Sequence, residues 1–131
     1  MPEQTRPRGK LTLQTVAMPA DTNMNGDIFG GWVVSHMDMA TGIAARRRAK
    51  GRAVTRAIDQ LEFIRPVYVG DTVCCYADLI KTGRTSMQFR IEVWTIALDN
   101  NNEEAMHKAA EGLFTFVAID EHGKPQAVDR N

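Results

Sequence analysis

The sequence lacks three features that would each point to a particular class of protein. No apolar run reaches the roughly 18 residues that a membrane helix needs, and residues 1–10 contain no apolar segment of a signal peptide. The 16 lysines and arginines are balanced by 16 aspartates and glutamates, so there is no positive excess to drive binding to nucleic acid. We therefore expect no membrane or nucleic acid as partner, and the cytoplasm as location.

Cysteine is also scarce. The two cysteines, Cys74 and Cys75, are adjacent in a segment with the pattern of a strand, where neighbouring side chains point to opposite faces. They are therefore not expected to bond to each other, and a small disulfide-stabilised protein is excluded. Cys75 is interpreted as a core residue rather than a nucleophile, because no neighbouring base can be identified.

What remains is the composition of an ordinary folded domain. Hydrophobic residues make up 44% of the 131-residue chain and charged residues 24%, which are typical values for globular domains. This length suits one hydrophobic core, and no linker-like stretch divides it. We predict a single domain over residues 1–131, with flexible ends at residues 1–9 and 121–131.

Hydrophobic periodicity predicts one long helix after a first strand. Residues 11–16 have the pattern of a short strand, and turn-forming residues follow as far as Gly26. From about Phe29 to the arginines at 46–48, apolar residues recur every three or four positions, which is typical of a helix. Gly51 stands where a helix end often needs a positive φ angle, and the arginines suit the negative end of the helix dipole.

The rest of the chain is predicted to be β-structure. Four segments show the alternation of strands: residues 54–65, 73–79, 86–93 and 106–119. Residues 99–104 form a polar connection. This order predicts an α+β fold, an antiparallel sheet with a single helix on one face. Where Trp94, Ile96, Leu113 or Val117 fall on the other face, we expect a second subunit to cover them.

The segment directly before the helix is polar and rich in glycine. Gly30 and Gly31 stand together at the helix start, where glycine loses more conformational entropy than other residues. They are explained if a ligand must approach the first backbone N–H groups, which have no partner within the helix. Tight packing of helix on sheet explains them equally well, and the spacing matches neither a dinucleotide-binding motif nor a P-loop.

Asp38 is the candidate base. It lies within the predicted helix, with the small residues Thr41 and Gly42 on the same side, so a substrate could reach it. Aspartate is normally ionised at neutral pH and can accept a proton. A hydrogen-bonded helix aspartate without a catalytic role is the commoner case, and position alone does not decide between them. No second histidine stands at metal-binding spacing from His36, so no metal site is predicted.

Several of these segments together resemble a known family. Residues 17–23, 26–32 and 37–39 look like the signature of hotdog-fold acyl-CoA thioesterases of the YciA type. Further matches follow at residues 51–55, 63–67, 69–76, 91–94 and 114–118. The resemblance implies a hotdog fold, in which an antiparallel sheet wraps a long central helix, assembled as a trimer of dimers. It also implies hydrolysis of acyl-coenzyme A without a metal or redox cofactor.

The resemblance further implies roles for particular residues. Asp38 would be the catalytic carboxylate, acting as general base on water or attacking the carbonyl directly. Gly30 and Gly31 would present backbone N–H groups to the thioester oxygen, where negative charge develops. Asp27 and Asn23 are secondary members of the site, and Asp27 ranks higher because some relatives carry a catalytically important asparagine there.

The coenzyme site implied by the resemblance is the segment of residues 83–86. Arg84 would supply charge, and Thr85 and Ser86 would supply hydroxyl groups, with Thr55 as a further member of this group. A solvated hairpin turn is an equally good interpretation of the segment. The denser basic group at residues 46–52 is better explained by the helix C-terminus and ordinary solvation.

Helix geometry adds a constraint that does not depend on the family. Asp38 is eight residues beyond Gly30, about 12 Å along the helix at a rise of 1.5 Å per residue. One helix cannot present both to the same carbonyl, so we predict a site shared between subunits of at least a dimer. Two alternatives stay open: hydration or dehydration of acyl-CoA on the same fold, although no histidine replaces Asp38, and a noncatalytic acyl-CoA sensor.

Overall fold

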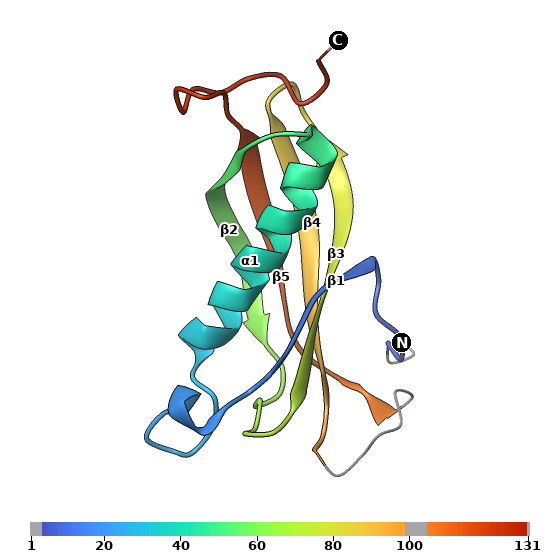
Figure 1. The fold of residues 1–131 in the computed structure, drawn as a ribbon. Helices are drawn as coiled ribbons and strands as arrows, with labels where there is room; N and C mark the ends of the chain where they lie inside the picture. The colour runs from blue at the N-terminus through green and yellow to red at the C-terminus, as the bar shows by residue number, and fades with distance from the viewer. Residues whose placement is uncertain (1–3, 99–104, 131) are drawn as a thin grey trace.

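One long helix crosses one face of a five-stranded antiparallel sheet (Figure 1). The computed structural model describes residues 4–98 and 105–130. The elements are β1 (Lys10–Val16), the short 3-10 helix η1 (Pro19–Asp21), α1 (Gly30–Ala49), β2 (Ala53–Phe63), β3 (Thr72–Thr82), β4 (Ser86–Ile96) and β5 (His107–Ala118). Across the sheet the strand order is β1-β3-β4-β5-β2. The predicted α+β architecture is confirmed, whereas the predicted connection at residues 99–104 lies outside the described residues.

The core lies between α1 and the sheet. Met87, Phe89, Ile91 and Val93 alternate along β4 and are all buried, as the sequence pattern predicted. They form one cluster with the helix residue Met37, which is completely buried. Burying a side chain of this size contributes about 1.5–3 kcal/mol. This contact sets the rotation of α1, and therefore the direction in which its other side chains point.

The two ends of α1 are built differently. At its start, the N-cap residue Phe29 makes no side-chain capping bond. At its end, Lys50 rather than Gly51 takes the left-handed conformation, with a φ of 53°, which corrects the sequence-based expectation. The small size of Gly51 instead leaves room for Arg130: a Cβ on Gly51 would lie 3.3 Å from Nη2 of Arg130, which donates to the Ala49 carbonyl.

The segment after β5 packs on the body of the protein. The Val128 side chain is buried in the core, and its N–H donates to the Arg84 carbonyl at 2.8 Å. The Gln126 N–H donates to the Ala118 carbonyl at 2.9 Å. Paired backbone groups and one buried side chain thus tie part of residues 121–130 to the body of the protein, while flexibility of the chain ends stays a prediction.

The N-terminal segment covers part of the second face of the sheet. Trp94 is only 1% exposed, so it needs no second subunit, contrary to the expectation from sequence. Its Nε1 donates to Glu92, which also accepts bonds from the Gln4 amide and Arg8 Nε at 2.9 Å. Burial alone would raise the pKa of Glu92, but the bonds from Trp94 and Arg8 and the charge of Lys108 hold it below its usual value.

Candidate active site

β2 supplies side chains to the helix face at irregular intervals. Its pairing with β5 shifts between Thr55 and Ala57, and again between Asp59 and Glu62. Each shift is a β-bulge, which inserts an extra residue and changes which side chains face the helix. Judged by their β5 partners and contacts, the helix-facing residues of β2 are Thr55, Ile58, Leu61 and Phe63. The spacing is three, three and two, so simple alternation does not describe this strand.

The first of these residues holds the candidate base. Thr55 Oγ1 donates to Asp38 Oδ1 at 2.6 Å, which links β2 to the middle of α1. The Asp38 side chain is half-buried, and within the described residues this is its one hydrogen bond. One carboxylate oxygen is therefore oriented while Oδ2 stays available to accept a proton. Within one chain, Thr55 thus lies with Asp38.

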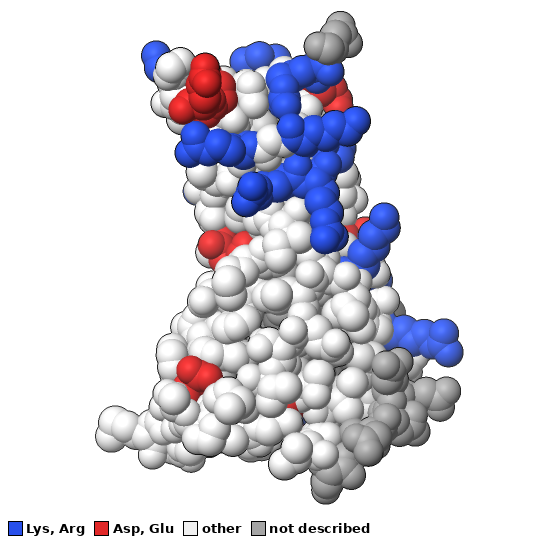
Figure 2. Space-filling model, in the orientation of Figure 1, with Lys and Arg blue, Asp and Glu red and all other residues white. Residues whose placement is uncertain are grey.

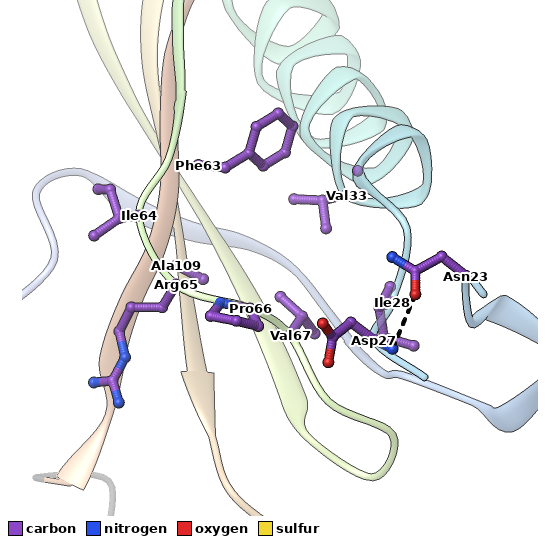
Figure 3. Close-up of a pocket in the computed structure, with 11 residues that line it drawn as sticks. Asn23, Asp27, Ile28, Val33, Phe63, Ile64, Arg65, Pro66, Val67 and Ala109 are labelled. Atoms are coloured by element: carbon purple, nitrogen blue, oxygen red, sulfur yellow. Dashed lines mark hydrogen bonds between the residues drawn. The ribbon is translucent and has the colours of Figure 1, made fainter. Parts of the chain in front are cut away.

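A cavity of about 420 Å³ lies beside the helix start (Figure 3). It is lined by three of the predicted site residues, Asn23, Asp27 and Gly30, together with side chains that follow β2. A Cβ added to Gly30 would lie 3.2 Å from Cζ of Phe63, so the ring packs closely against this glycine. No described side chain caps the helix start, so its first N–H groups can also bind a developing negative charge.

The loop before the helix is organised by Asn23. Its Oδ1 accepts bonds from the N–H groups of Asn25 at 2.8 Å and Asp27 at 3.1 Å, and its own N–H donates to the Asp27 carbonyl at 2.6 Å. The Asn23 amide oxygen is thus used within the loop. The Asp27 carboxylate makes no hydrogen bond within the described residues and lines the cavity. Of the two, Asp27 is the one available to a ligand.

The predicted coenzyme segment lies apart from this cavity. Gly83 N–H donates to the Ser86 carbonyl at 2.8 Å, which closes a tight turn, and the Thr85 carbonyl accepts a bond from Ala118 N–H. The side chain of Arg84 is exposed. This turn lies near the C-terminal end of α1, where Arg130 meets Ala49, and the 20-residue helix separates it from Gly30 by about 30 Å.

Positive charge gathers at the same end of the molecule. Figure 2 shows Lys and Arg concentrated over the part where α1 ends, while the surface near the helix start is mostly uncharged. The last turn of α1 contributes Arg46, Arg47 and Arg48 to this surface. Arg48 is paired with Asp129 at 2.8 Å. The remaining cations can attract an anionic ligand to this end.

Within one chain, then, the predicted residues occupy three places. These are the cavity at the helix start, the Asp38–Thr55 pair at mid-helix, and the turn at 83–86. Sequence reasoning missed Phe63 and Arg65 as cavity-lining residues, because it treated residues 63–67 only as a matching segment. The signal available was the loss of alternation along β2, which marks bulges.

Other candidate groups are accounted for by their surroundings. Burial, and then the neighbouring Cys74, raise the pKa of the Cys75 thiol to about 12, as expected for a core residue rather than a nucleophile. The His36 ring lies 3.9 Å from the Trp32 ring at a tilt of 34°, and its Nδ1 lies 2.8 Å from the Trp32 carbonyl. In residues 4–98 and 105–130, no three His, Cys, Asp or Glu side chains converge on a metal site. None of the helices described here combines the length and apolarity needed to span a bilayer.

Known proteins resemble this chain over almost its full length. The model of the thioesterase superfamily matches residues 25–97. The acyl-CoA thioester hydrolase YciA of Escherichia coli strain K12 is 50% identical over 122 residues, which cover 93% of this chain and 92% of that protein.

Two crystal structures share the fold closely. One is HI0827, a hexameric broad-specificity acyl-coenzyme A thioesterase, solved with one aspartate replaced by alanine. It matches with a TM-score of 0.90 and 44% identity, over 95% of this chain and 89% of that one. The other is a hexameric thioesterase from Yersinia pestis, at a TM-score of 0.89 and 48% identity over 96% of this chain and 100% of that one.

Proposed function

This chain belongs to the thioesterase superfamily and has the hotdog fold of YciA-type acyl-CoA thioester hydrolases, and from this premise we propose Asp38 as its catalytic carboxylate. The reaction is hydrolysis of acyl-coenzyme A to free acid and coenzyme A, as predicted from the resemblance. The observation that supports Asp38 is its single hydrogen bond from Thr55 at 2.6 Å, which orients one oxygen and leaves the other available.

In the proposed mechanism, Asp38 acts as general base. Oδ2 takes a proton from water as the water oxygen bonds to the thioester carbon. The negative charge that forms on the carbonyl oxygen is stabilised by the N–H groups of Gly30 and Gly31 at a helix start. The C–S bond then breaks, and the sulfur of coenzyme A leaves as thiolate and takes up the proton. A carboxylate and backbone amides supply every step, so the proposal includes no metal or redox cofactor.

The site requires two copies of the chain. Asp38 and Gly30 are about 12 Å apart on one helix, too far to act on the same carbonyl. β2 forms one edge of the sheet and exposes Val54 by 44% and Ile58 by 39%, while Met39 on α1 is 47% exposed. Unpaired strand edges and apolar patches of this kind are typical interfaces. The solved relatives are hexamers, and this chain is a homo-oligomer.

We propose a dimer through the β2 edges, three of which form the hexamer. Antiparallel pairing of two β2 strands also places the two helices antiparallel, so the start of each helix points toward the middle of the other. Asp38 of one chain can then meet the helix start of the second, near Asp27 and Asn23. The same symmetry brings the cationic end of one chain, with Arg84, Thr85 and Ser86, toward the helix start of its partner, where coenzyme A phosphates need positive charge.

We also propose that this reaction serves acyl-CoA metabolism in the cytoplasm. Cys74 and Cys75 are both buried, and no disulfide joins them. That arrangement suits a reducing compartment better than an oxidising one.

The test compares Asp38→Asn with Asp59→Asn, an exposed aspartate on the outer side of β2. Thiol release from acyl-CoAs of several chain lengths is measured with a colorimetric thiol reagent, and oligomeric state by size-exclusion chromatography. We expect Asp38→Asn to lose roughly 100-fold or more of kcat while remaining assembled, since general-base catalysis contributes 10²–10⁴-fold. Asp59→Asn should match the unmodified protein. Full activity of Asp38→Asn would exclude the assigned role, and binding without thiol release by the unmodified protein would favour the sensor.

A further inference from the structure

The second bulge of β2 changes which side chains face the helix. It lies between Asp59 and Glu62, and within it Gln60 has a φ of 51°, a conformation that residues other than glycine seldom adopt. Before the bulge the helix-facing residue is Ile58; after it, Phe63 pairs with Ala110 on that face and Glu62 pairs with Glu111 on the other. Without the extra residue, Glu62 would face the helix. Bulges are common beside active sites, where they redirect a side chain.

The contacts on the helix side of the bulge are close. Cδ1 of Leu61 lies 3.3 Å from the position that a Cβ on Gly112 would occupy, next to the methyl of Met37. Phe63 comes within 3.2 Å of the equivalent position on Gly30. Leu61 therefore anchors the end of β2 to the core, and Phe63 is held directly over the helix start. Phe63 is nevertheless 52% exposed in the single chain, and it lines the cavity.

The wall that Phe63 forms is apolar. Figure 3 shows Phe63 and Val33 near the helix, with Pro66 and Val67 beyond them, while Ile64 points away from the helix. All of these residues belong to the lining of the cavity, whose charged members are Asp27 and Arg65. Most of the lining consists of hydrocarbon side chains, which suit an acyl chain. The cavity at the helix start is therefore suited to the apolar end of the substrate.

We infer that Phe63 is a specificity-determining residue, whose ring closes the acyl pocket and limits the chain length accepted. This inference rests on the proposed function, because the thioester carbonyl must lie at the N–H groups of Gly30 and Gly31. An acyl chain extending from that point meets the Phe63 ring directly. Short acyl groups gain contact with the ring, and longer groups are obstructed by it.

The experiment measures kcat/KM for butanoyl-, octanoyl- and dodecanoyl-CoA. In Phe63→Ala we expect the ratio of dodecanoyl to butanoyl activity to rise at least tenfold, since each methylene newly buried changes binding by about fourfold. Phe63→Leu should give a smaller shift in the same direction. Glu62→Ala is the matched control, because Glu62 is next to Phe63 but its side chain faces away from the cavity. Gln60→Gly should keep both the bulge and the dependence of kcat/KM on acyl chain length.

Each result has one meaning. A ratio unchanged in Phe63→Ala, or in Phe63→Leu if the alanine variant does not assemble, overturns the inference while the proposed function stands. Altered inhibition by free coenzyme A with an unchanged acyl profile also overturns it, because the cavity would then hold the coenzyme arm. Absence of thiol release from any acyl-CoA by the unmodified protein refutes the proposed function itself.

Discussion

Replacing Thr55 with valine would remove the hydroxyl that holds Asp38 and keep the shape of the side chain. The Oγ1–Oδ1 distance of 2.6 Å is that of a hydrogen bond to a charged acceptor. Such bonds contribute about 1.5–3 kcal/mol. Because the bond orients the carboxylate for proton transfer, its loss should raise the barrier by about this energy; each 1.4 kcal/mol lowers the rate tenfold, so kcat should fall by about 10- to 150-fold.

Stability should respond much less than the rate. Thr55 is exposed and Asp38 is half-buried in the single chain, so water can replace the lost hydrogen bond in the resting protein. The net change in the free energy of unfolding should be about 0–1 kcal/mol. The expected signature of Thr55→Val is therefore a slow enzyme with a nearly unchanged melting temperature.

The assay pairs steady-state thiol release with thermal unfolding for three proteins. Thr55→Ser retains the hydroxyl and should keep kcat within about threefold of the unmodified protein, whereas Thr55→Val should not. Two results would refute the reasoning. One is a Thr55→Val enzyme as fast as the original, and the other is a serine variant as slow as the valine variant.

Two further predictions concern stability. Because the pKa of Glu92 lies below its ordinary value of 4.5 in the folded protein, its stabilisation is complete above that value and is lost as pH falls through the lower folded-state value. Glu92→Gln should therefore cost about 1–3 kcal/mol at pH 7 and flatten the acid limb of a melting-temperature profile; an equally steep limb would contradict this. Lys50→Gly should raise the free energy of unfolding by about 0.5–1 kcal/mol in denaturant titrations, because Lys50 has a φ of 53°, which glycine adopts more easily. A loss of stability would show that contacts of the lysine side chain contribute more than the relief of the backbone.

β2 shows where prediction from sequence stopped. Alternation correctly assigned the buried face of β4, from Met87 to Val93, because the period of two is a local property of an extended chain. In β2 the same rule fails, since the two bulges depend on how its backbone pairs with β5, about fifty residues further along the chain. The inward position of Phe63 could not be derived without that pairing.

The surroundings of Glu92 and Trp94 were also not predictable from local sequence patterns. Alternation places both residues on the outer face of the sheet, where a second subunit was expected to cover Trp94. Instead Trp94 is buried within the single chain and donates to Glu92, which binds Gln4 and Arg8 through contacts that span more than eighty residues of sequence. No local pattern in a polar N-terminal segment indicates which distant carboxylate it will bind.

The sequence by itself determined the order of the elements, the long helix from about Phe29 to the arginine run, and the position of Asp38 on it, because helical and strand periodicities are carried by neighbouring residues. The resemblance of its motifs also indicated the family and the reaction. Only the tertiary structure decided that Thr55 donates a hydrogen bond to Asp38 and that Phe63 packs over Gly30. Those relations join strand to helix across the core, and they depend on packing between segments that are separate in the sequence.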